Sequence, residues 1–303
     1  MKDFISIYDY SADQLKELLA MSTELKQLYK SGGRDWCLAG KTLAMLFEKP
    51  SLRTRISFQV AMADLGGEAI YVKPEDIGGI GQRESIKDVA RVLSRYVHGI
   101  MARTFEHSVV IELGAFSSVP VINALTGWSH PCQAMSDVLT IQEHLERVEG
   151  IRLAFIGDGN NVARSLAFTA GKLGMKIVIA SPAGYELDRE TIDKANAIGS
   201  GSVRQTNDPR EAVADADVIY TDTWISMGQE SEKQKRLADF AGFGVDAKLV
   251  SCAPAGVKIM HCLPAYRGFE ITDEVAESPD SIIFDQAENR LHFQRALLKK
   301  LIG

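Results

Sequence analysis

Short apolar runs alternate with segments of helical periodicity along most of the chain. Nine of these runs are typical of short buried strands, and they cover residues 41–47, 69–72, 99–103, 119–125, 151–157, 176–180, 217–222, 257–263 and 281–285. The first helical pattern covers residues 11–30, where Ser11 and Gln14 have the spacing of a capping box and Gly32-Gly33 follow. Alternation of this kind predicts parallel sheets flanked by helices.

The pattern divides into two halves with roughly four strands each, so we expect an α/β protein of two domains. The first domain is expected over residues 1–130 and the second over 150–280, each with a parallel sheet flanked by helices. A helical segment over 131–149 would join them. The last helix, expected within 287–303, would pack back on the first domain. Its apolar stripe consists of Phe293, Ala296, Leu297 and Leu301.

One predicted helix start carries its charge in an unexpected place. The segment "FEKPSLRTRISF", residues 47–58, is typical of a strand end, a turn and a helix with Ser51 as its N-cap. A helix N-terminus carries partial positive charge, which disfavours cations, yet Lys49, Arg53 and Arg55 all gather there. Hydroxyl groups, free backbone N–H groups and the guanidinium of Arg53 are together what a phosphate ester requires.

The same helix has an apolar stripe at helical spacing, which predicts the face that it buries. The stripe consists of Leu52, Ile56, Val60 and Ala63, and Gly66-Gly67 would end the helix. A different interpretation of the cations is a solvated helix start with surface Arg–Glu pairs, because charge runs are usually solvated faces.

Polar clusters also follow other predicted strands. "MARTF" places Arg103 directly after an apolar strand, "HPCQ" places His130 and Gln133 at a strand-to-helix turn, and "HCLP" places His261 and Cys262 at a third turn. Ligands of open α/β sheets gather at the carboxyl ends of strands. The clusters therefore favour a binding site over packing.

Composition restricts the class of protein. The chain has 303 residues, 46% hydrophobic and 24% charged, which is ordinary for a globular protein. A net charge of -6 argues against a general nucleic-acid binder. No apolar run has the length of a membrane span, and the first residues lack the apolar core of a signal peptide. Four widely spaced cysteines do not form a disulfide framework, so we expect a reducing cytoplasm.

Seven strings in order resemble motifs of the aspartate/ornithine carbamoyltransferase family. "SLRTR", "MARTF", "HPCQ" and "HCLPA" resemble motifs of the whole family, and "GDGNN", "DTWISMGQE" and "AENR" resemble its ornithine branch. The resemblance covers most of the chain. It implies a carbamoyl-phosphate domain first, an ornithine domain second, and catalysis between them without a metal or cofactor. The implied reaction moves the carbamoyl group of carbamoyl phosphate to the δ-amine of L-ornithine, giving L-citrulline and phosphate. The expected setting is arginine metabolism, with arginine biosynthesis as the expected pathway, and the sequence leaves the biosynthetic and degradative directions open.

The resemblance also implies roles for individual residues. Arg103, His130, Asp222 and Cys262 would be catalytic, with Arg103 and His130 donating to the carbamoyl oxygen. The residues implied to bind carbamoyl phosphate are Ser51, Leu52, Arg53, Thr54, Gln82, Arg103, His130, Gln133, Cys262, Leu263 and Arg290. Those implied to bind ornithine are Asn161, Asp222, Ser226 and Met227.

The implied acceptor is consistent with the charges of these residues. An alkyl ammonium has a pKa of about 10.4, so the site must select the neutral amine, and the family places Asp222 and Cys262 next to the attacking nitrogen. Asp222 suits an α-ammonium, and Asn161 at a helix start suits an α-carboxylate. "DTWISMGQE" has no arginine, which an aspartate acceptor would favour. Taken singly, Asp222 is as typical of a helix cap, and Cys262 of a small buried hydrophobe.

Leu52 departs from the family pattern, which usually has threonine at this position. If the position acts through its backbone N–H, leucine costs nothing. If the hydroxyl also contacts phosphate, affinity falls by about 1 kcal/mol for one lost hydrogen bond. We favour the first interpretation.

Three other functions are compatible with parts of the sequence. A dinucleotide site is suggested by Gly157 and Gly159, but Val162 replaces the third glycine and Ser181 stands where an acid is needed. A non-catalytic scaffold would be expected to have lost reactive residues, which this chain keeps. A zinc site has poor spacing, because two of its ligands are adjacent. Its ligands would be His130, Cys132, His261 and Cys262.

The family suggests a homotrimer in which a loop of one subunit enters the site of the next. The corresponding segment here is "PEDIGGIGQRES", residues 74–85, and Gln82 is the residue expected to contribute. The expected partners are therefore two small-molecule substrates and further copies of this chain, with neither nucleic acid nor membrane.

Overall fold

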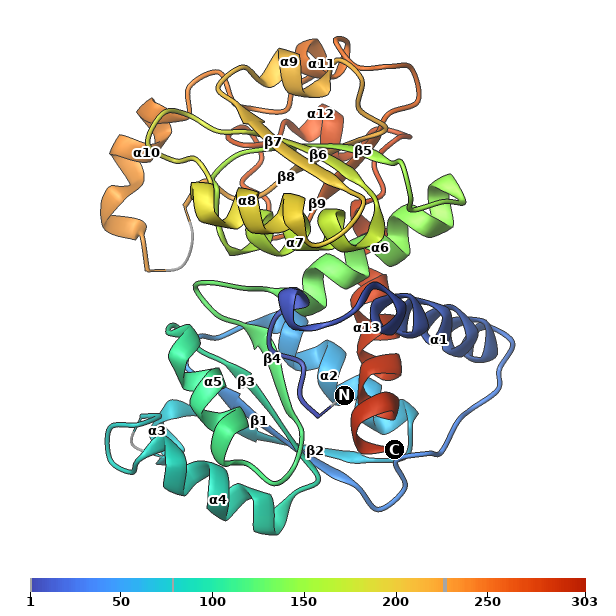
Figure 1. Ribbon diagram of the computed structural model, residues 1–303, viewed down its shortest axis with the longest axis vertical. Coiled ribbons are helices and arrows are strands. Elements are labelled where there is room, and N and C mark those ends of the chain that lie inside the picture. The colour runs from blue at the N-terminus through green and yellow to red at the C-terminus, as the bar shows by residue number, and fades with distance from the viewer. Residues whose placement is uncertain (1, 78, 226–227) are drawn as a thin grey trace. The chain divides into compact units, whose positions relative to one another are not determined.

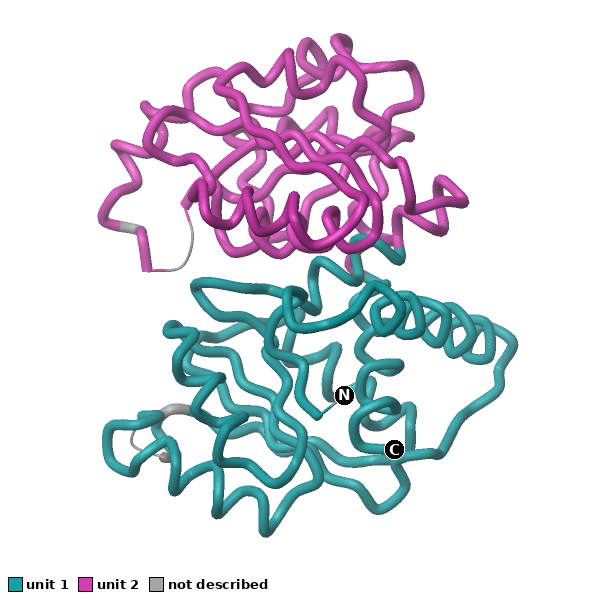
Figure 2. The backbone as a smooth tube through the Cα atoms, in the orientation of Figure 1, with its two compact units in different colours: residues 1–139, 288–303 teal, residues 140–287 magenta. Residues whose placement is uncertain are grey.

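The computed structural model describes residues 2–77, 79–225 and 228–303 of the 303-residue chain. The chain forms two compact units: unit 1 comprises residues 1–139 and 288–303, and unit 2 comprises residues 140–287 (Figure 2). Each unit is built on its own parallel sheet with flanking helices. The predicted α/β fold class with two parallel sheets is therefore confirmed. Within the described ranges, no helix has the length and apolar character needed to span a bilayer.

Unit 1 contains a four-stranded sheet in the order β2-β1-β3-β4, with every pair parallel. Its central strands are continuous apolar runs, because both faces of a parallel sheet are covered. The edge strand β2 is partly exposed. The four strands are β1 (Thr42–Phe47), β2 (Glu68–Val72), β3 (Gly99–Arg103) and β4 (Val121–Leu125).

Helices cover both faces of this sheet. Helices α4 and α5 pack on the face formed by Ala44, Leu46, Ile100 and Ala102, and Figure 1 shows α1, α2 and α13 on the other side. The helices that lie wholly or partly in unit 1 are η1 (Ile7–Asp9), α1 (Ala12–Lys30), α2 (Leu52–Asp64), α3 (Pro74–Ile77), α4 (Ile86–Tyr96), α5 (His107–Phe116), α6 (Pro131–Leu145) and α13 (Ile283–Ile302).

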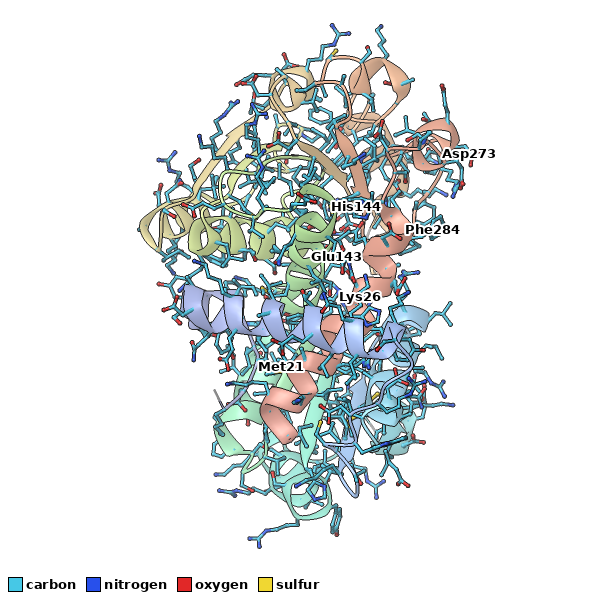
Figure 3. All side chains as sticks on the ribbon, turned by 90° about the vertical axis from the view of Figure 1, so that its right-hand side faces the viewer. Met21, Lys26, Glu143, His144, Asp273 and Phe284 are labelled. Atoms are coloured by element: carbon cyan, nitrogen blue, oxygen red, sulfur yellow. The ribbon has the colours of Figure 1, made fainter. Side chains whose placement is uncertain are left out.

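The last helix belongs with the first unit over most of its length, as the apolar stripe predicted. Phe293 packs on Phe4 with ring centroids 5.8 Å apart. Lys26 of α1, labelled in Figure 3, donates to Asn289 Oδ1 at 2.8 Å. The helix begins earlier than expected, at Ile283.

Unit 2 contains a five-stranded parallel sheet in the order β7-β6-β5-β8-β9. Its core includes a stack of Trp224 on Phe240 with ring centroids 5.4 Å apart. The strands are β5 (Arg152–Ile156), β6 (Lys176–Ala180), β7 (Ser202–Thr206), β8 (Val218–Thr221) and β9 (Lys258–His261). The helices are α7 (Asn161–Leu173), α8 (Arg189–Ala197), α9 (Pro209–Val213), η2 (Glu230–Glu232), α10 (Lys233–Asp239), α11 (Ala247–Val250) and α12 (Asp273–Ala276).

Both sheets contain a switch point where the chain changes its direction across the sheet. In unit 1 it lies between β1 and β3, and in unit 2 between β5 and β8. Ligands of open α/β sheets bind outside the carboxyl ends of the strands at such points. Ligands are therefore expected at the segments that follow β1, β3 and β4 in unit 1 and β5, β8 and β9 in unit 2.

Two strand predictions were wrong. Residues 281–285 do not form a strand, because only Ser281 pairs, in an isolated bridge with Ile259, and α13 starts two positions later. Strand β7 was missed, because this edge strand, "SVRQT", is mostly polar and lacks an apolar run.

The predicted buried stripe of α2 was also wrong. Leu52, Ile56 and Val60 are 76%, 49% and 37% exposed, and Ala63 is exposed as well. The helix instead buries Thr54, Phe58, Ala61 and Met62. The sequence of α2 carries two stripes at helical spacing, and periodicity alone does not say which one faces the sheet. We call Leu52, Ile56, Val60 and Ala63 the exposed stripe of α2.

Candidate active site

The start of α2 forms the first part of a site in unit 1. Ser51 is the N-cap, as predicted, and its Oγ accepts a hydrogen bond from the Thr54 N–H at 3.3 Å. The first turn contains no acid, so the positive end of the helix dipole and Arg53 present positive charge together. This geometry suits an anion.

Two buried arginines converge on the same turn. Arg103, at the end of β3, donates to Thr54 Oγ1 at 3.2 Å, and Arg290, from α13, donates to the same atom at 3.0 Å. Thr54, Arg103 and Arg290 are all buried. Because the Thr54 oxygen accepts from both guanidinium groups, its own proton remains available to donate to a ligand.

His130 lies close to these arginines and carries no charge itself. Burial lowers its pKa well below the usual value, and the charges of Arg290, Arg103 and Arg53 lower it further. At neutral pH the imidazole is therefore uncharged and has one N–H to donate. The cluster of Arg53, Arg103, Arg290 and His130 was predicted from separate strings, and the structure brings it together.

Gln133 lies two residues inside α6 and is almost fully buried. Its amide nitrogen donates to Asp137 Oδ1 at 2.7 Å. Among the described residues, its Oε1 has no hydrogen-bond partner. Because a buried carbonyl without a donor is unfavourable, this oxygen is suited to accept an N–H from a ligand.

Lys49 is a further cation of this site, although the sequence did not predict a role for it. Its ammonium lies 4.1 Å from the centre of the Phe105 ring. Burial lowers its pKa, and the charge of Arg103 lowers it further. The feature of the sequence that could have indicated this role is the position of Lys49 in "FEKPS", between the end of β1 and the N-cap of α2.

Gln82 is not brought to these residues within the chain. It is exposed in the segment between α3 and α4. Its side chain folds back over Gly79, and its backbone N–H donates to the Gly79 carbonyl at 3.3 Å. A role for Gln82 in this site would therefore require another copy of the chain.

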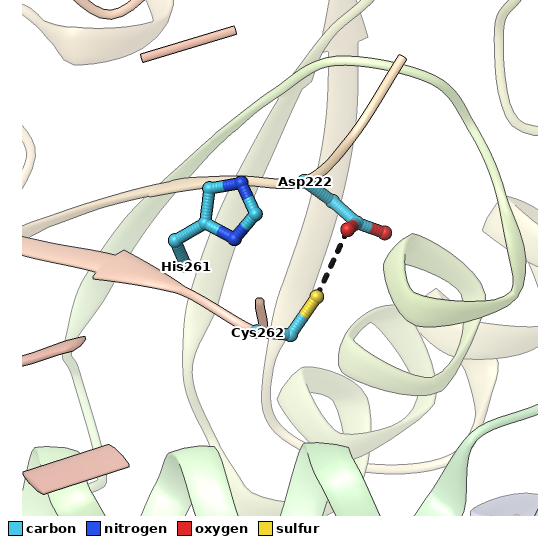
Figure 4. Close-up of side chains that lie close together, drawn as sticks. All are labelled: Asp222, His261 and Cys262. Carbon is cyan, nitrogen blue, oxygen red and sulfur yellow. Dashed lines mark hydrogen bonds between the residues drawn. The ribbon is translucent and has the colours of Figure 1, made fainter. Parts of the chain in front are cut away.

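Unit 2 contains a second group of predicted residues, at the ends of β8 and β9. Asp222 is buried, and its Oδ1 accepts the Cys262 thiol at 2.9 Å, as Figure 4 shows. Its Oδ2 accepts from Asn160 Nδ2 at 2.8 Å. The carboxylate is therefore held from two sides, next to a thiol.

Asn160 was not predicted, because Asn161 was chosen from the same "GDGNN" string. The structure makes Asn160 the N-cap of α7, with its Oδ1 accepting from the Val162 and Ala163 N–H groups at 2.9 and 3.1 Å. Asn161 is the first residue of the helix and is half-buried. The missed signal was an asparagine directly before a capped apolar helix. The predicted Ser226 and Met227 lie outside the described residues.

Arg236 is a second residue that the sequence did not single out. Its Nη1 donates to Asp158 Oδ2 at 2.8 Å and to the Trp224 carbonyl at 3.0 Å, and its Nε donates to Glu232 at 2.9 Å. This buried guanidinium therefore ties the turn after β5 to the segment that follows Asp222.

The glycine-rich turn after β5 does not have the space that a dinucleotide needs. The second glycine of the fingerprint lets the pyrophosphate approach the backbone. Here the Gly159 N–H donates to the Tyr185 carbonyl at 2.8 Å. A Cβ atom at Gly159 would lie 2.3 Å from the Leu187 nitrogen. The protein's own chain therefore covers this approach.

The zinc ligands proposed from the sequence do not fit their surroundings. Cys132 is fully buried, its thiol donates to the Asn123 carbonyl at 3.5 Å, and burial raises its pKa to about 12. Among the described residues, Asp222, His261 and Cys262 do place ligand atoms within 4.8 Å of one another. Both ring nitrogens of His261 are already in hydrogen bonds, however, with Glu270 and with the Leu263 N–H.

Comparison with known proteins gives the same picture over the whole length of the chain. The model described as the carbamoyl-P binding domain of aspartate/ornithine carbamoyltransferase matches residues 2–143, and the model of the Asp/Orn binding domain matches residues 149–301. The ornithine carbamoyltransferase of Methanosarcina mazei is 50% identical over 301 residues, which cover 99% of both chains. That of Archaeoglobus fulgidus is 50% identical over 304 residues, 100% of this chain and 98% of the other.

Solved structures agree. The ornithine carbamoyltransferase from Pyrococcus furiosus is 48% identical and superposes with a TM-score of 0.97, covering 100% of this chain and 97% of the other. The anabolic ornithine carbamoyltransferase from Campylobacter jejuni is 40% identical, with a TM-score of 0.93 and 99% of each chain covered.

Proposed function

The chain belongs to the aspartate/ornithine carbamoyltransferase family, and from this premise we propose that it transfers the carbamoyl group of carbamoyl phosphate to the δ-amine of L-ornithine. The products are L-citrulline and phosphate. The observation that supports this most strongly is the buried cluster of Arg103, Arg290 and His130 at the start of α2. Purified protein should form citrulline and phosphate in equal amounts only when both substrates are present. Phosphate release without citrulline would contradict the proposal.

Unit 1 supplies the groups for carbamoyl phosphate. The Ser51 and Thr54 hydroxyls, the first-turn N–H groups of α2 and Arg53 hold the phosphate. Arg103 bridges phosphate and carbamoyl oxygen, and Arg290 adds positive charge. Segments 1–130 and 287–303 therefore form the carbamoyl-phosphate domain of this proposal.

His130 and Arg103 stabilise the charge that develops on the carbamoyl oxygen. A neutral imidazole donates one hydrogen bond without repelling the surrounding guanidinium groups. Pre-organised donors of this type are worth roughly 3–4 kcal/mol each in a transition state. The Gln133 Oε1 and the Leu263 carbonyl accept hydrogen bonds from the carbamoyl NH2. These bonds orient the carbamoyl group and so determine which of its faces the amine can attack.

Segment 150–280 supplies the groups for the acceptor. The Asp222 carboxylate and the Cys262 thiol lie beside the attacking nitrogen. Asp222 also holds the α-amino end together with Ser226 and Met227, and Asn161 receives the α-carboxylate. In the reaction a C–N bond forms, the bond from carbon to phosphate oxygen breaks, and the amine proton ends on the phosphate. No metal or cofactor enters this sequence.

Leu52 acts through its backbone N–H in this proposal. Its side chain is 76% exposed, so it neither packs in the core nor blocks the N–H. Leu52→Thr should therefore leave the affinity for carbamoyl phosphate within a few-fold of wild type, measured as Kd by calorimetry. A gain of tenfold or more, which is about 1.4 kcal/mol, would show that the missing hydroxyl matters.

A homo-oligomer, with a trimer as the expected state, would cover the exposed stripe of α2. Isolated surface hydrophobes are normal, but a contiguous apolar stripe is typical of an interface. The neighbouring copy would bring the segment with Gln82 to the cationic cluster. We place this enzyme in the cytoplasm, in arginine biosynthesis, and the likeness to the anabolic Campylobacter jejuni enzyme supports that setting.

Ile56→Glu should dissociate such an oligomer, because it would bury a charge in an apolar contact. Light scattering should give a multiple of the 33.2 kDa chain mass for wild type and a smaller mass for the variant. Ile111→Glu, at an exposed position of α5, is the matched control and should keep the wild-type mass. Equal masses for Ile56→Glu and wild type would contradict the assignment of this stripe.

A further inference from the structure

The end of β9 carries a buried pair that the proposed roles do not use. His261 and Glu270 are each about 1% exposed, and His261 Nε2 lies 3.1 Å from Glu270 Oε1. The other ring nitrogen, Nδ1, accepts the backbone N–H of Leu263 at 2.8 Å. A backbone N–H is always the donor, so Nδ1 carries no proton and Nε2–H donates to Glu270. The surroundings therefore fix one tautomer of His261.

Glu270 is itself held in place. Its Oε1 also accepts the Tyr266 N–H at 2.6 Å, and its backbone carbonyl accepts the Val245 N–H at 2.9 Å. The backbone of His261 is held separately: its N–H donates to Gln286 Oε1 at 2.9 Å, and Gln286 Nε2 donates to the Tyr220 hydroxyl at 3.1 Å. Both the backbone and the imidazole of His261 are thus held by hydrogen bonds.

The bond from His261 to Leu263 closes a small ring around Cys262. Leu263 has a φ of +56°, in the left-handed region that leucine rarely adopts. Such a conformation persists where its surroundings enforce it, and it is concentrated at functional sites. Within this ring the Cys262 thiol is directed to Asp222 at 2.9 Å (Figure 4).

We propose that His261 and Glu270 are positioning residues for this turn. Glu270 holds His261 in the tautomer whose Nδ1 accepts from Leu263, and this hydrogen bond orients the Leu263 carbonyl and the Cys262 thiol toward the reacting groups. The inference rests on the proposed function, in which the Leu263 carbonyl contacts the carbamoyl NH2 and the Cys262 thiol lies beside the attacking amine. Neither residue touches substrate itself.

Two variants of His261 separate the two hydrogen bonds. In His261→Asn the amide oxygen can take the place of Nδ1 and accept from Leu263. In His261→Gln the amide nitrogen can reach the place of Nε2 and donate to Glu270, but the Leu263 N–H loses its acceptor. We expect His261→Gln to lower kcat/KM on the order of 100-fold, as displacement of reacting groups by about 1 Å does, and His261→Asn to recover most of this loss.

Glu270 gives an independent pair of variants. Glu270→Gln keeps an acceptor oxygen for Nε2–H and for the Tyr266 N–H, so its kcat/KM should stay near wild type. Glu270→Leu removes the acceptor, and the tautomer is no longer fixed, so its kcat/KM should fall as in His261→Gln. This pair tests the inference even where a His261 variant fails to fold.

Binding of two anions separates positioning from general loss of structure. Inorganic phosphate has no carbamoyl group and should contact only the groups of unit 1. Its shift of the melting temperature should therefore be the same in wild type and His261→Gln. The preference for carbamoyl phosphate over phosphate, measured as the ratio of their Kd values, should fall in His261→Gln and Glu270→Leu but not in Glu270→Gln.

The decisive experiment measures citrulline formation and both Kd values for wild type and the four variants. Recovery in His261→Asn and Glu270→Gln, with a selective loss of the carbamoyl phosphate preference in the other two, is the expected result. Equal activity of His261→Asn and His261→Gln, or an unchanged preference in all four, overturns the positioning role while wild-type citrulline formation upholds the reaction. A wild type that forms no citrulline overturns the proposed function instead.

Discussion

Asp222→Asn is expected to lower kcat/KM for L-ornithine by at least about 100-fold, equivalent to about 2.7 kcal/mol. The carboxylate accepts hydrogen bonds from the Cys262 thiol and from Asn160 Nδ2. In the variant, one carboxylate oxygen is replaced by an NH2 group, which is a donor. It would therefore meet either the Cys262 thiol or Asn160 Nδ2, which are donors themselves. The variant would also lose the negative charge that attracts the ammonium of the substrate. Initial rates at saturating carbamoyl phosphate, with ornithine varied, measure the effect.

Asp280→Asn is the matched control, because Asp280 belongs to the same unit but not to the group around Asp222. Its carboxylate pairs with the Lys258 ammonium at 2.7 Å, and Lys258 lies at the start of β9, whereas Asp222 follows the end of the neighbouring strand β8. Its kcat/KM should stay within about twofold of wild type, as surface ion pairs contribute little. Similar losses in both variants would mean that a general disturbance of unit 2 causes the effect.

Arg53→Ala should remove most of the stabilisation that phosphate gives to the protein. A ligand at 100 times its Kd stabilises the folded state by about 2.7 kcal/mol, and a 100-fold weaker Kd reduces this to about 0.4 kcal/mol. Without phosphate the variant should be as stable as wild type or more stable, because a cation at a helix N-terminus is unfavourable. Thermal melting with and without phosphate measures both quantities.

Arg55→Ala provides the comparison for that result. Arg55 stands in the same first turns of α2, but its guanidinium lies 4.1 Å from the centre of the Tyr71 ring, and its Nε donates to Gln59 Oε1 at 3.4 Å. It should keep the phosphate-dependent shift. A full shift in Arg53→Ala would contradict the phosphate role of Arg53.

The sequence predicted the fold class because apolar runs in buried parallel strands are continuous. "TLAMLF" in β1 and "RLAFI" in β5 could be recognised in this way. Strand β7 could not, since an edge strand with exposed residues leaves no such run. The segment 281–285 has an apolar run, but it lies where the chain enters α13, and short apolar runs do not distinguish strands from helix starts.

Part of the candidate site could be predicted because several sequence strings lead to one place in the fold. Arg53, Arg103 and His130 follow three strands of one sheet, so the topology brings them together once the sheet is parallel. Tertiary contacts that leave no motif were missed. The sequence analysis chose Asn161, but the N-cap of α7 that contacts Asp222 is the residue before it, Asn160. Arg236 donates to Asp158 and to the Trp224 carbonyl, and sequence spacing does not indicate these contacts.

The exposed stripe of α2 shows a different reason for failure. Apolar residues in a sequence indicate a surface that is buried from water, but they do not indicate whether it is covered by the chain's own core or by another molecule. Phe58 and Met62 are buried, whereas Ile56 and Val60 are exposed. A sequence pattern with two apolar faces is therefore better interpreted as one core face and one candidate interface.

The most direct test of the central claim compares carbamoyl acceptors. Citrulline-type product is measured with L-ornithine, putrescine, L-aspartate and N-acetyl-L-ornithine, each at the same concentrations and with saturating carbamoyl phosphate. The highest kcat/KM is expected for L-ornithine, because its α-ammonium and α-carboxylate match Asp222 and Asn161. A higher kcat/KM for any of the other three acceptors would contradict the assignment of ornithine.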